Sequence, residues 1–277
     1  MNDYHEDTEA RSIKHNLSII YALSLCISVL IATAASAGIL FQERLYPTLE
    51  LRRSFLTNDY VILFIGLPML LGSMWATWFG SLLGLLFWPG ALVFVLYNYF
   101  IYVFALPFNL MFLLSLLLVM LSIYTLISLL TSMNGTWIRQ RLADVVPERF
   151  AGGVLAGLGF LFFLRAFAAL AIALAGQTTI EETELALLAT DLLIAPAWMI
   201  GGLLLWQRKE FGYISGLGLL FQASMLFIGL IIVLLMQPSM TGSAFVLSDV
   251  IVVFAMGLVC FIPFALFIRG VLSSVRH

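Results

Sequence analysis

Charged residues are scarce in this chain of 277 residues: Asp, Glu, Lys and Arg make up 10% of it, whereas 62% of the residues are hydrophobic. An ordinary soluble domain is about 25% charged and about 45–50% apolar. Apolar residues in this excess have too little polar surface to cover them in water, and the mean hydropathy of +1.09 agrees. The sequence therefore predicts an integral membrane protein.

Basic clusters are missing as well. The chain has 13 Lys and Arg residues against 15 Asp and Glu residues, and no run of Lys and Arg is long enough to follow a phosphate backbone. This excludes nucleic acid as a partner. A Gly-rich phosphate-binding loop is also absent from the sequence, so any transport is expected to depend on gradients rather than on ATP.

Histidine is absent from the apolar segments, because His5, His15 and His277 all lie in the polar tails. A zinc hydrolase with His ligands, or a Ser–His proteolytic dyad, would therefore lack its central residue type within the membrane. The two cysteines, Cys26 and Cys260, lie in apolar runs without a metal-binding spacing. We expect neither a metal nor a cofactor.

Long apolar runs are what the chain has in abundance. A helix needs about 20 mostly apolar residues to cross the hydrocarbon core, and Gly80–Ser81 and Pro107–Asn109 mark two of the turns between such runs. The expected fold is an all-α membrane protein, a bundle of about eight transmembrane helices in one polytopic domain, residues 1–277. The predicted spans are about 17–40, 60–79, 82–105, 108–132, 152–175, 185–206, 212–236 and 245–269.

An even number of spans places both termini on one side of the membrane. About nine Lys and Arg residues fall on that side and about three on the other, which by the positive-inside rule predicts that both termini are cytoplasmic. Residues 1–16 then form a polar cytoplasmic tail. We expect the protein to lie in the cell membrane, with the lipid bilayer as its first partner.

Two connections combine Arg with large apolar residues at a roughly helical spacing, PTLELRRSFL at 47–56 and WIRQRLADVV at 137–146. Each is typical of a short helix in the headgroup zone, and an ordinary amphipathic linker is the alternative. The first four spans and the last four show no convincing sequence repeat.

Arg165 lies in the otherwise apolar stretch FLFFLRAFAAL, residues 160–170. Arg at the centre of a membrane helix costs about 2.5–3.5 kcal/mol on insertion scales, so it normally has a partner. Asp191 and Asp249 are the candidates, at depths of roughly 10 and 6 Å against roughly 15 Å for Arg165. The long Arg side chain can extend toward them. We expect the three groups to converge in the outer half of the bundle, if their helices are neighbours.

Other polar groups lie near these three. Asp59 begins the second predicted span, and Gln222 lies near the middle of the seventh, where its amide needs a hydrogen-bond partner. Gly157 shares a helical face with Arg165, and a face with small residues is expected to pack against protein. Tyr99 and Tyr102, at the outer end of the third span, are interpreted as part of an aromatic belt.

The sequence favours gradient-driven translocation of a small solute or ion over an enzymatic function. Arg165 would hold an anion or a carboxylate, Asp191 would carry a proton or cation, and Asp249 and Asp59 would be outer gate groups. Pro196 lies one turn beyond Asp191 and would loosen the helix there. The alternative for Arg165 is a dry structural salt bridge.

Two other functional classes stay open. An integral membrane enzyme could act on lipid or isoprenoid substrates, with Asp191 and Asp249 in acid and base roles. A non-catalytic sensor or assembly subunit could bind a membrane partner through residues 137–150, and the chain could also form a homo-oligomer.

Overall fold

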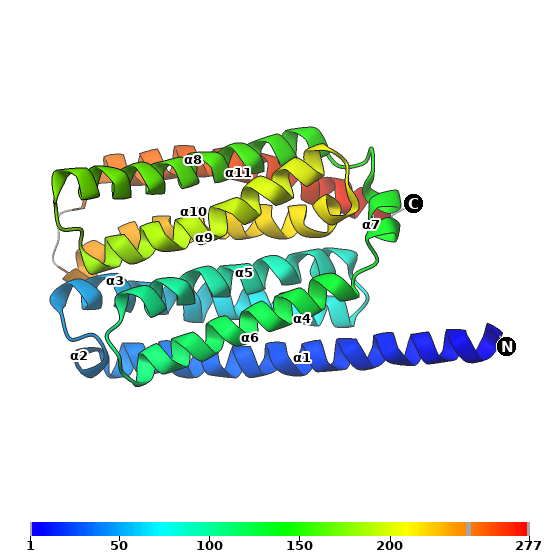
Figure 1. The fold of residues 1–277 in the computed structure, drawn as a ribbon, viewed down its shortest axis with the longest axis horizontal. Coiled ribbons are helices and arrows are strands. Elements are labelled where there is room, and N and C mark those ends of the chain that lie inside the picture. The colour runs from blue at the N-terminus through cyan, green and yellow to red at the C-terminus, as the bar shows by residue number, and fades with distance from the viewer. Residues whose placement is uncertain (1, 242–244, 276–277) are drawn as a thin grey trace.

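The computed structural model describes residues 2–241 and 245–275, and every element of regular secondary structure within them is a helix (Figure 1). The helices are α1 (Asn2–Leu40), α2 (Gln42–Leu45), α3 (Leu49–Val61), the π-helical segment η1 (Ile62–Gly66), α4 (Leu67–Trp78), α5 (Leu82–Ala105), α6 (Leu110–Ser132), α7 (Gly135–Leu142), α8 (Glu148–Gly176), α9 (Glu182–Trp206), α10 (Glu210–Thr241) and α11 (Leu247–Val275).

Within this described part of the chain, 8 helices are long and apolar enough to cross a membrane. The spans are Leu17–Leu40, Leu49–Trp78, Leu82–Ala105, Leu110–Ser132, Glu148–Gly176, Glu182–Trp206, Glu210–Met236 and Leu247–Ser274. The expected fold class is confirmed, and the chain is a multi-pass membrane protein. Both termini lie at one end of the bundle, here called the terminal side, and the opposite end is the distal side (Figure 1). That the terminal side is cytoplasmic stays a prediction.

The second span begins earlier than predicted. Helix α3 continues through η1 into α4, so one apolar helix runs from Leu49 to Trp78. The prediction of a separate interfacial helix at 47–56 is therefore wrong, because most of that segment forms the first turns of the span. The polar residues around Asp59 suggest a membrane boundary, but the helix continues past Asp59, whose carboxylate is buried among hydrogen-bond donors.

The two turns expected from the sequence are present. Gly80 has a φ of 78°, a left-handed conformation that glycine adopts at little cost, and it separates α4 from α5. The side chain of Ser81 then accepts a hydrogen bond from the Gly84 N–H at 3.3 Å and caps α5. After α5, the Asn109 side chain caps α6 in the same way, through the Phe112 N–H at 2.9 Å.

The second amphipathic segment forms the separate short helix α7. Its apolar residues Ile138 and Leu142 are buried, and α7 contacts α10 and α11. Arg141 lies 5.3 Å from the centre of the Trp137 ring and donates a hydrogen bond to the Ser274 carbonyl at 3.3 Å. The apolar face of α7 is therefore occupied by the chain itself.

The two halves of the chain have the same order of helix contacts. In the first half each span contacts the next, and α6 returns to contact α1. In the second half α8, α9, α10 and α11 follow in the same order, and α11 returns to contact α8. Because four spans bring the chain back to its starting side, the halves run parallel rather than inverted (Figure 1).

The halves meet where α5 contacts α10 and α9. Helix α5 is the most enclosed span, with 83% of its most apolar window buried. A Cβ atom added at Gly90 of α5 would overlap the carbonyl of Gly218 in α10, so the two backbones touch. Small residues permit such close approach of membrane helices. Helix α5 therefore lies between α4 of the first half and α9 and α10 of the second half.

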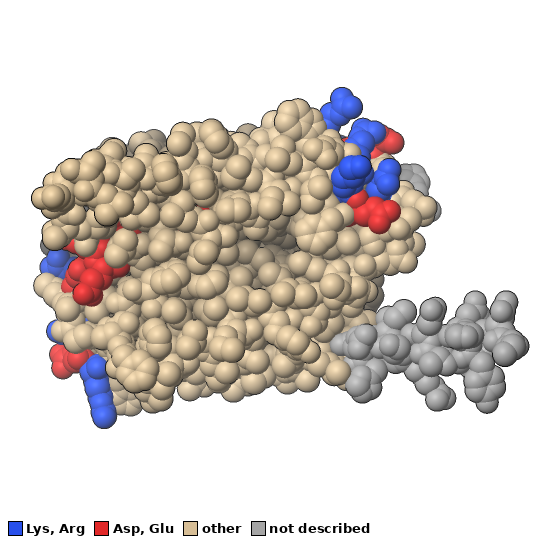
Figure 2. Space-filling view, viewed as in Figure 1, with Lys and Arg blue, Asp and Glu red and all other residues tan. Residues whose placement is uncertain are grey.

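Charged side chains gather at the two ends of the bundle. Figure 2 shows Lys and Arg in blue and Asp and Glu in red at these ends, with an almost uncharged flank between them. Large apolar side chains such as Phe64, Met120, Phe167 and Leu193 are exposed on the spans. An exposed apolar surface of this extent is expected where side chains face lipid.

Candidate functional site

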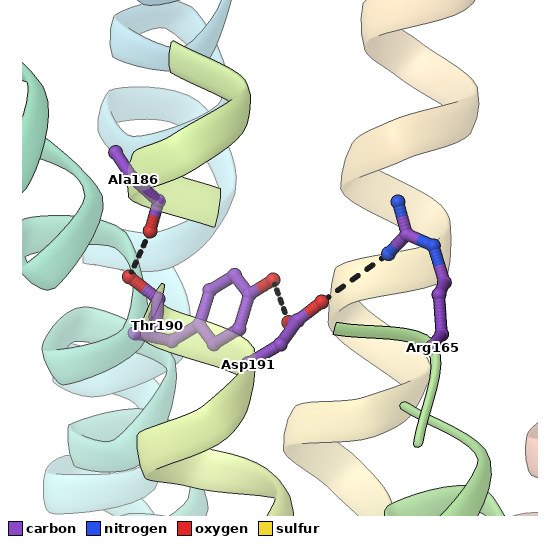
Figure 3. Close-up of polar contacts among 5 residues, drawn as sticks. Arg165, Ala186, Thr190 and Asp191 are labelled. Carbon is purple, nitrogen blue, oxygen red and sulfur yellow. Dashed lines mark hydrogen bonds and ion pairs between the residues drawn. The ribbon is translucent and has the colours of Figure 1, made fainter. Parts of the chain in front are cut away.

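The centre of the candidate site is the carboxylate of Asp191, in the third turn of α9. Its side chain is 2% exposed, and Nη1 of Arg165 from α8 lies 3.3 Å from its Oδ2 atom (Figure 3). The Tyr97 hydroxyl of α5 donates a hydrogen bond to the other oxygen, Oδ1, at 2.9 Å. The expected contact between Arg165 and Asp191 is therefore present, and a tyrosine that sequence reasoning did not identify completes it.

Helix α9 is continuous through Pro196, one turn beyond Asp191. Proline lacks the N–H that would bond to the carbonyl four residues earlier, yet the helix does not break at this point. Nearby, Thr190 donates its hydroxyl hydrogen to the Ala186 carbonyl at 2.8 Å (Figure 3). Asp191 is thus presented from a regular helix rather than from an unwound segment.

A cavity of about 600 Å³ adjoins the ion pair, within the range of roughly 300–1,000 Å³ of small-molecule sites. Apolar side chains from α3, α5, α8, α9, α10 and α11 form most of its wall. The side chains on the wall that carry polar atoms are Asn58, Tyr97, Asn98, Arg165, Asp191 and Trp198. The site is therefore an apolar chamber with one ion pair and a few hydrogen-bonding groups.

Arg165 faces this cavity, with a side chain that is 54% exposed. The expected packing of the face that holds Gly157 is wrong, because Gly157 is exposed and an added Cβ atom there would meet no atom within 4 Å. The packed face of α8 instead holds Gly152 and Gly159, where an added Cβ atom would lie 2.6 Å from the Gly202 carbonyl and 2.8 Å from the Ala195 carbonyl of α9, respectively. Because α8 is oriented with Gly152 and Gly159 against α9, Arg165 faces the cavity.

Gln222 of α10 lies behind the cavity wall and is fully buried. Its Oε1 atom accepts a hydrogen bond from Nε1 of Trp198 at 2.6 Å, which supplies the partner that its depth requires. Within the described residues, its Nε2 atom has no hydrogen-bond partner. Gln222 therefore positions Trp198 on the wall without lining the cavity itself.

Asp59 belongs to a second, separate cluster. It is 0% exposed, and it accepts hydrogen bonds from the hydroxyls of Tyr46 at 2.6 Å and Tyr102 at 2.7 Å. Burial, followed by the nearby Asp59 carboxylate, raises the pKa of Tyr46, so the Tyr46 hydroxyl keeps its proton and remains a donor. Asn58, on the cavity wall, lies 3.5 Å from the Tyr102 hydroxyl through Nδ2 and is the nearest link between the two clusters.

The interpretation of Tyr99 and Tyr102 as an aromatic belt is wrong, because both side chains are 0% exposed. Their helix is the central one, so protein rather than the bilayer interface surrounds its distal end. A signal was present in the sequence: at 3.6 residues per turn, Tyr97 points to nearly the opposite side of the helix from Tyr99 and Tyr102. A helix with polar aromatic groups on several sides is better placed inside a bundle than at its edge.

Asp249 does not join the pair. It is exposed in the first turn of α11, where its carboxylate accepts a hydrogen bond from the Ser248 hydroxyl at 3.3 Å, and it is not among the residues that line the cavity. An acidic side chain in the first turn of a helix is stabilised by the helix dipole. Asp249 therefore lies at the start of its helix and outside the cluster around Asp191.

Among the described residues, no group of three or more His, Cys, Asp and Glu side chains could hold a metal ion. The arrangement around Asp191 instead offers one cation with unused N–H donors, one anion with two bound oxygens, and an apolar chamber beside them. Such a site can bind an anionic group and exchange a proton. No family model, curated protein or solved structure matches this chain.

Proposed function

We propose that this protein carries a small organic anion across the membrane and that Arg165 binds the anion. The observation that carries the proposal is the position of the guanidinium group. It lies on the wall of an apolar cavity, is 54% exposed, and makes its ion pair with Asp191 through Nη1. A guanidinium has five N–H donors, so donors remain for a second anionic group.

The charge balance of the pair supports coupling to a proton. In the structure the positive Arg165 and the negative Asp191 cancel each other in a surrounding of low dielectric. An anion that takes over Arg165 leaves the Asp191 carboxylate without its cation, and an unpaired buried charge is costly. A proton on Asp191 removes that cost, so the anion and the proton bind together and the net charge of the site stays zero.

The cavity wall supports an organic body for the solute. Most lining residues are apolar, and two of the polar ones, Tyr97 and Arg165, contact Asp191. A hydrated inorganic ion would need oxygen ligands around it to replace its water, whereas an apolar wall stabilises a hydrocarbon group by removing it from water. The carrier proposal therefore takes an organic anion rather than a simple inorganic ion.

The two alternatives receive less support. An acid and base pair of Asp191 and Asp249 would need both carboxylates at one substrate, but Asp249 does not line the cavity. A partner bound through residues 137–150 would need the apolar face of α7, but that face packs on α10 and α11.

Proton-coupled flux in vesicles tests the proposal. Purified protein is reconstituted into phosphatidylcholine vesicles that contain a pH-sensitive dye, and ethane-, propane- or butanesulfonate is added outside. Sulfonates stay ionised, so they do not cross the bilayer as neutral acids. We expect the lumen to acidify with the wild-type protein, and the rate to be the same when valinomycin and potassium collapse the membrane potential.

Two variants identify the site. Asp191→Asn removes the group that takes the proton, so acidification should stop although the protein still inserts and folds. Glu184→Gln is the matched control, because Glu184 is an exposed carboxylate on the same helix face and does not line the cavity; its rate should equal that of the wild type. Equal rates for wild type, Asp191→Asn and protein-free vesicles would refute the carrier.

A further inference from the structure

The mouth of the cavity lies among apolar side chains of three spans. Lining residues with large exposed fractions are Leu161 of α8 at 59%, Leu230 of α10 at 44% and Met256 of α11 at 46%. Arg165, also exposed, lies one turn from Leu161 on α8. The cavity therefore opens at the side of the bundle, between α8 and the pair α10–α11.

The depth of this mouth places it within the hydrocarbon core. At 1.5 Å per residue, Leu161 lies about 20 Å from the start of α8 and about 22 Å from its end, and the core is about 30 Å thick. By the same rise, Met256 lies about 14 Å along α11 from its first residue. Molecules that arrive at this mouth come from the lipid rather than from water.

On the distal side, a hydrogen-bonded contact joins the two halves beyond the cavity. The Thr183 N–H of α9 donates a hydrogen bond to Oε1 of Glu50 in α3 at 3.1 Å, and the Thr183 hydroxyl donates to the same oxygen. These residues lie one to two turns beyond Leu187 and Asn58, which line the distal part of the cavity. The two halves are therefore joined on the distal side of that part of the wall.

The cavity continues beyond the ion pair toward the terminal side. By the helix rise, Asn98, Asn58 and Asp191 lie about 11–14 Å, and Arg165 about 17 Å, from the distal ends of their helices. Along α9 the wall extends from Asp191 to Trp198, about 10 Å further toward the terminal side, where apolar residues such as Leu161 and Leu226 also line it. A lipid whose head group lies at Arg165 therefore has apolar space for its chain.

We propose that the organic anion is an amphiphile of the bilayer, a single-chain lipid with an anionic head group, which enters sideways between α8 and α11. Its head group binds Arg165, and its chain lies against α10 in the direction of Trp198. This inference rests on the proposed function, because it names the class of solute that the carrier takes. It also explains why the cavity wall around a charged pair is otherwise apolar.

Photo-crosslinking in membranes tests the inference. The full-length protein is reconstituted into phosphatidylcholine vesicles that contain a hexadecyl sulfonate with a diazirine in its chain. After irradiation, labelled peptides are identified by mass spectrometry. We expect labelling of residues 226–230 on α10 and of Trp198. Exposed residues of α6 such as Leu113 and Leu117, which face lipid away from the cavity, report background labelling.

Arg165→Gln should reduce the cavity labelling at least about tenfold, the effect of losing roughly 1.4 kcal/mol of binding or more, and should leave the α6 labelling unchanged. A second pair of variants keeps the test valid if Arg165→Gln misfolds. Met256→Trp narrows the mouth of the cavity. Ile262→Trp is its control, because it adds a Trp side chain at an exposed position of α11 that does not line the cavity. Labelling should fall in the first variant and persist in the second.

The outcomes separate the two proposals. Cavity labelling no higher than α6 labelling, or equal labelling in wild type and Arg165→Gln, would overturn the lipid substrate; butanesulfonate flux in the same preparation would then leave a carrier of water-soluble anions. Labelling that depends on Arg165, without flux of any sulfonate, would refute the carrier and retain the lipid site. Competition by unlabelled hexadecanesulfonate but not by butanesulfonate at equal concentration is the result expected if both proposals hold.

Discussion

Asp59 and Asp191 occupy matching places in the two halves of the chain, yet their surroundings differ. Each lies in the third turn of the second span of its half, and each accepts a hydrogen bond from a tyrosine of α5. Asp59 is 0% exposed and has a second tyrosine as its other donor. Asp191 has Arg165 instead and faces a cavity.

The comparison shows that a carboxylate within a membrane bundle is not by itself a site. Asp59 is enclosed by neutral donors, which stabilise the fold only while both hydroxyls keep their geometry. Asp191 has a half-exposed countercharge and space beside it, as the proposed exchange of its partner requires. The adjoining space, rather than the residue type, distinguishes the candidate site from the structural cluster.

The largest effect is expected when the Arg165–Asp191 pair is replaced as a whole by Leu and Leu. Sulfonate flux should fall at least about 30-fold, because loss of a buried charged contact costs roughly 2 kcal/mol or more. The thermal midpoint should change little or rise, since apolar replacements of buried ion pairs are often neutral or stabilising. Flux and tryptophan-detected unfolding in detergent give the two readings. A large fall in the midpoint with normal flux would make the pair structural.

The next effect is expected at Gly38, which packs against the carboxylate of Asp59. A Cβ atom added there would overlap Asp59 Oδ2 and the Tyr46 hydroxyl. Gly38→Ala should lower the thermal midpoint by about 3–10 °C, from an overpacking cost of roughly 1–3 kcal/mol. Gly157→Ala is the matched control with open space around the added atom, and its midpoint should not fall. Equal midpoints for both variants would contradict the packing described for Asp59.

A smaller effect separates the two tyrosines of α5. Tyr102→Phe removes one of the two donors to Asp59 and should cost about 1–3 kcal/mol in the free energy of unfolding, without a change in flux per folded protein. Tyr97→Phe leaves Asp191 with Arg165, so its stability cost should be lower and its flux should change. Chemical unfolding and vesicle flux, measured on both variants, would refute the distinction if the two behaved alike.

The smallest effect is expected from Asp249→Asn. Asp249 does not line the cavity, so no contact supports the gate role expected for it. Flux should therefore stay within about twofold of the wild type, which corresponds to the roughly ±0.5 kcal/mol of ordinary surface substitutions. A loss of flux comparable to that of Asp191→Asn would bring Asp249 back into the site and weaken the contrast between the two regions.

The eight spans could be predicted because length and hydropathy alone determine them. The Arg165–Asp191 contact could be anticipated from depth, since few partners exist for a charge within the membrane. The start of the second span could not be predicted, because the polar residues near Asp59 are typical of a membrane boundary. Only the tyrosine donors from elsewhere in the chain make it possible to bury that carboxylate.

The identity of neighbouring helices was the missing information. The central place of α5 explains why Tyr97 and Tyr102 bind carboxylates rather than line the interface. The cavity depends on the rotation of α8, which places Gly152 and Gly159 against α9 and turns Gly157 outward. The sequence places small residues on both sides of α8, and only the packing of the helices determines which side faces α9.

The close packing of α8 on α9 has a consequence for the biogenesis of the protein. During synthesis α8 leaves the ribosome first, with Arg165 near its centre and no carboxylate yet beside it. A charged helix centre costs about 2.5–3.5 kcal/mol on insertion, and the connection from Gly176 to Glu182 is short. The two helices are therefore expected to partition into the bilayer as one hairpin, with Asp191 neutralising the arginine before α8 is released alone to lipid.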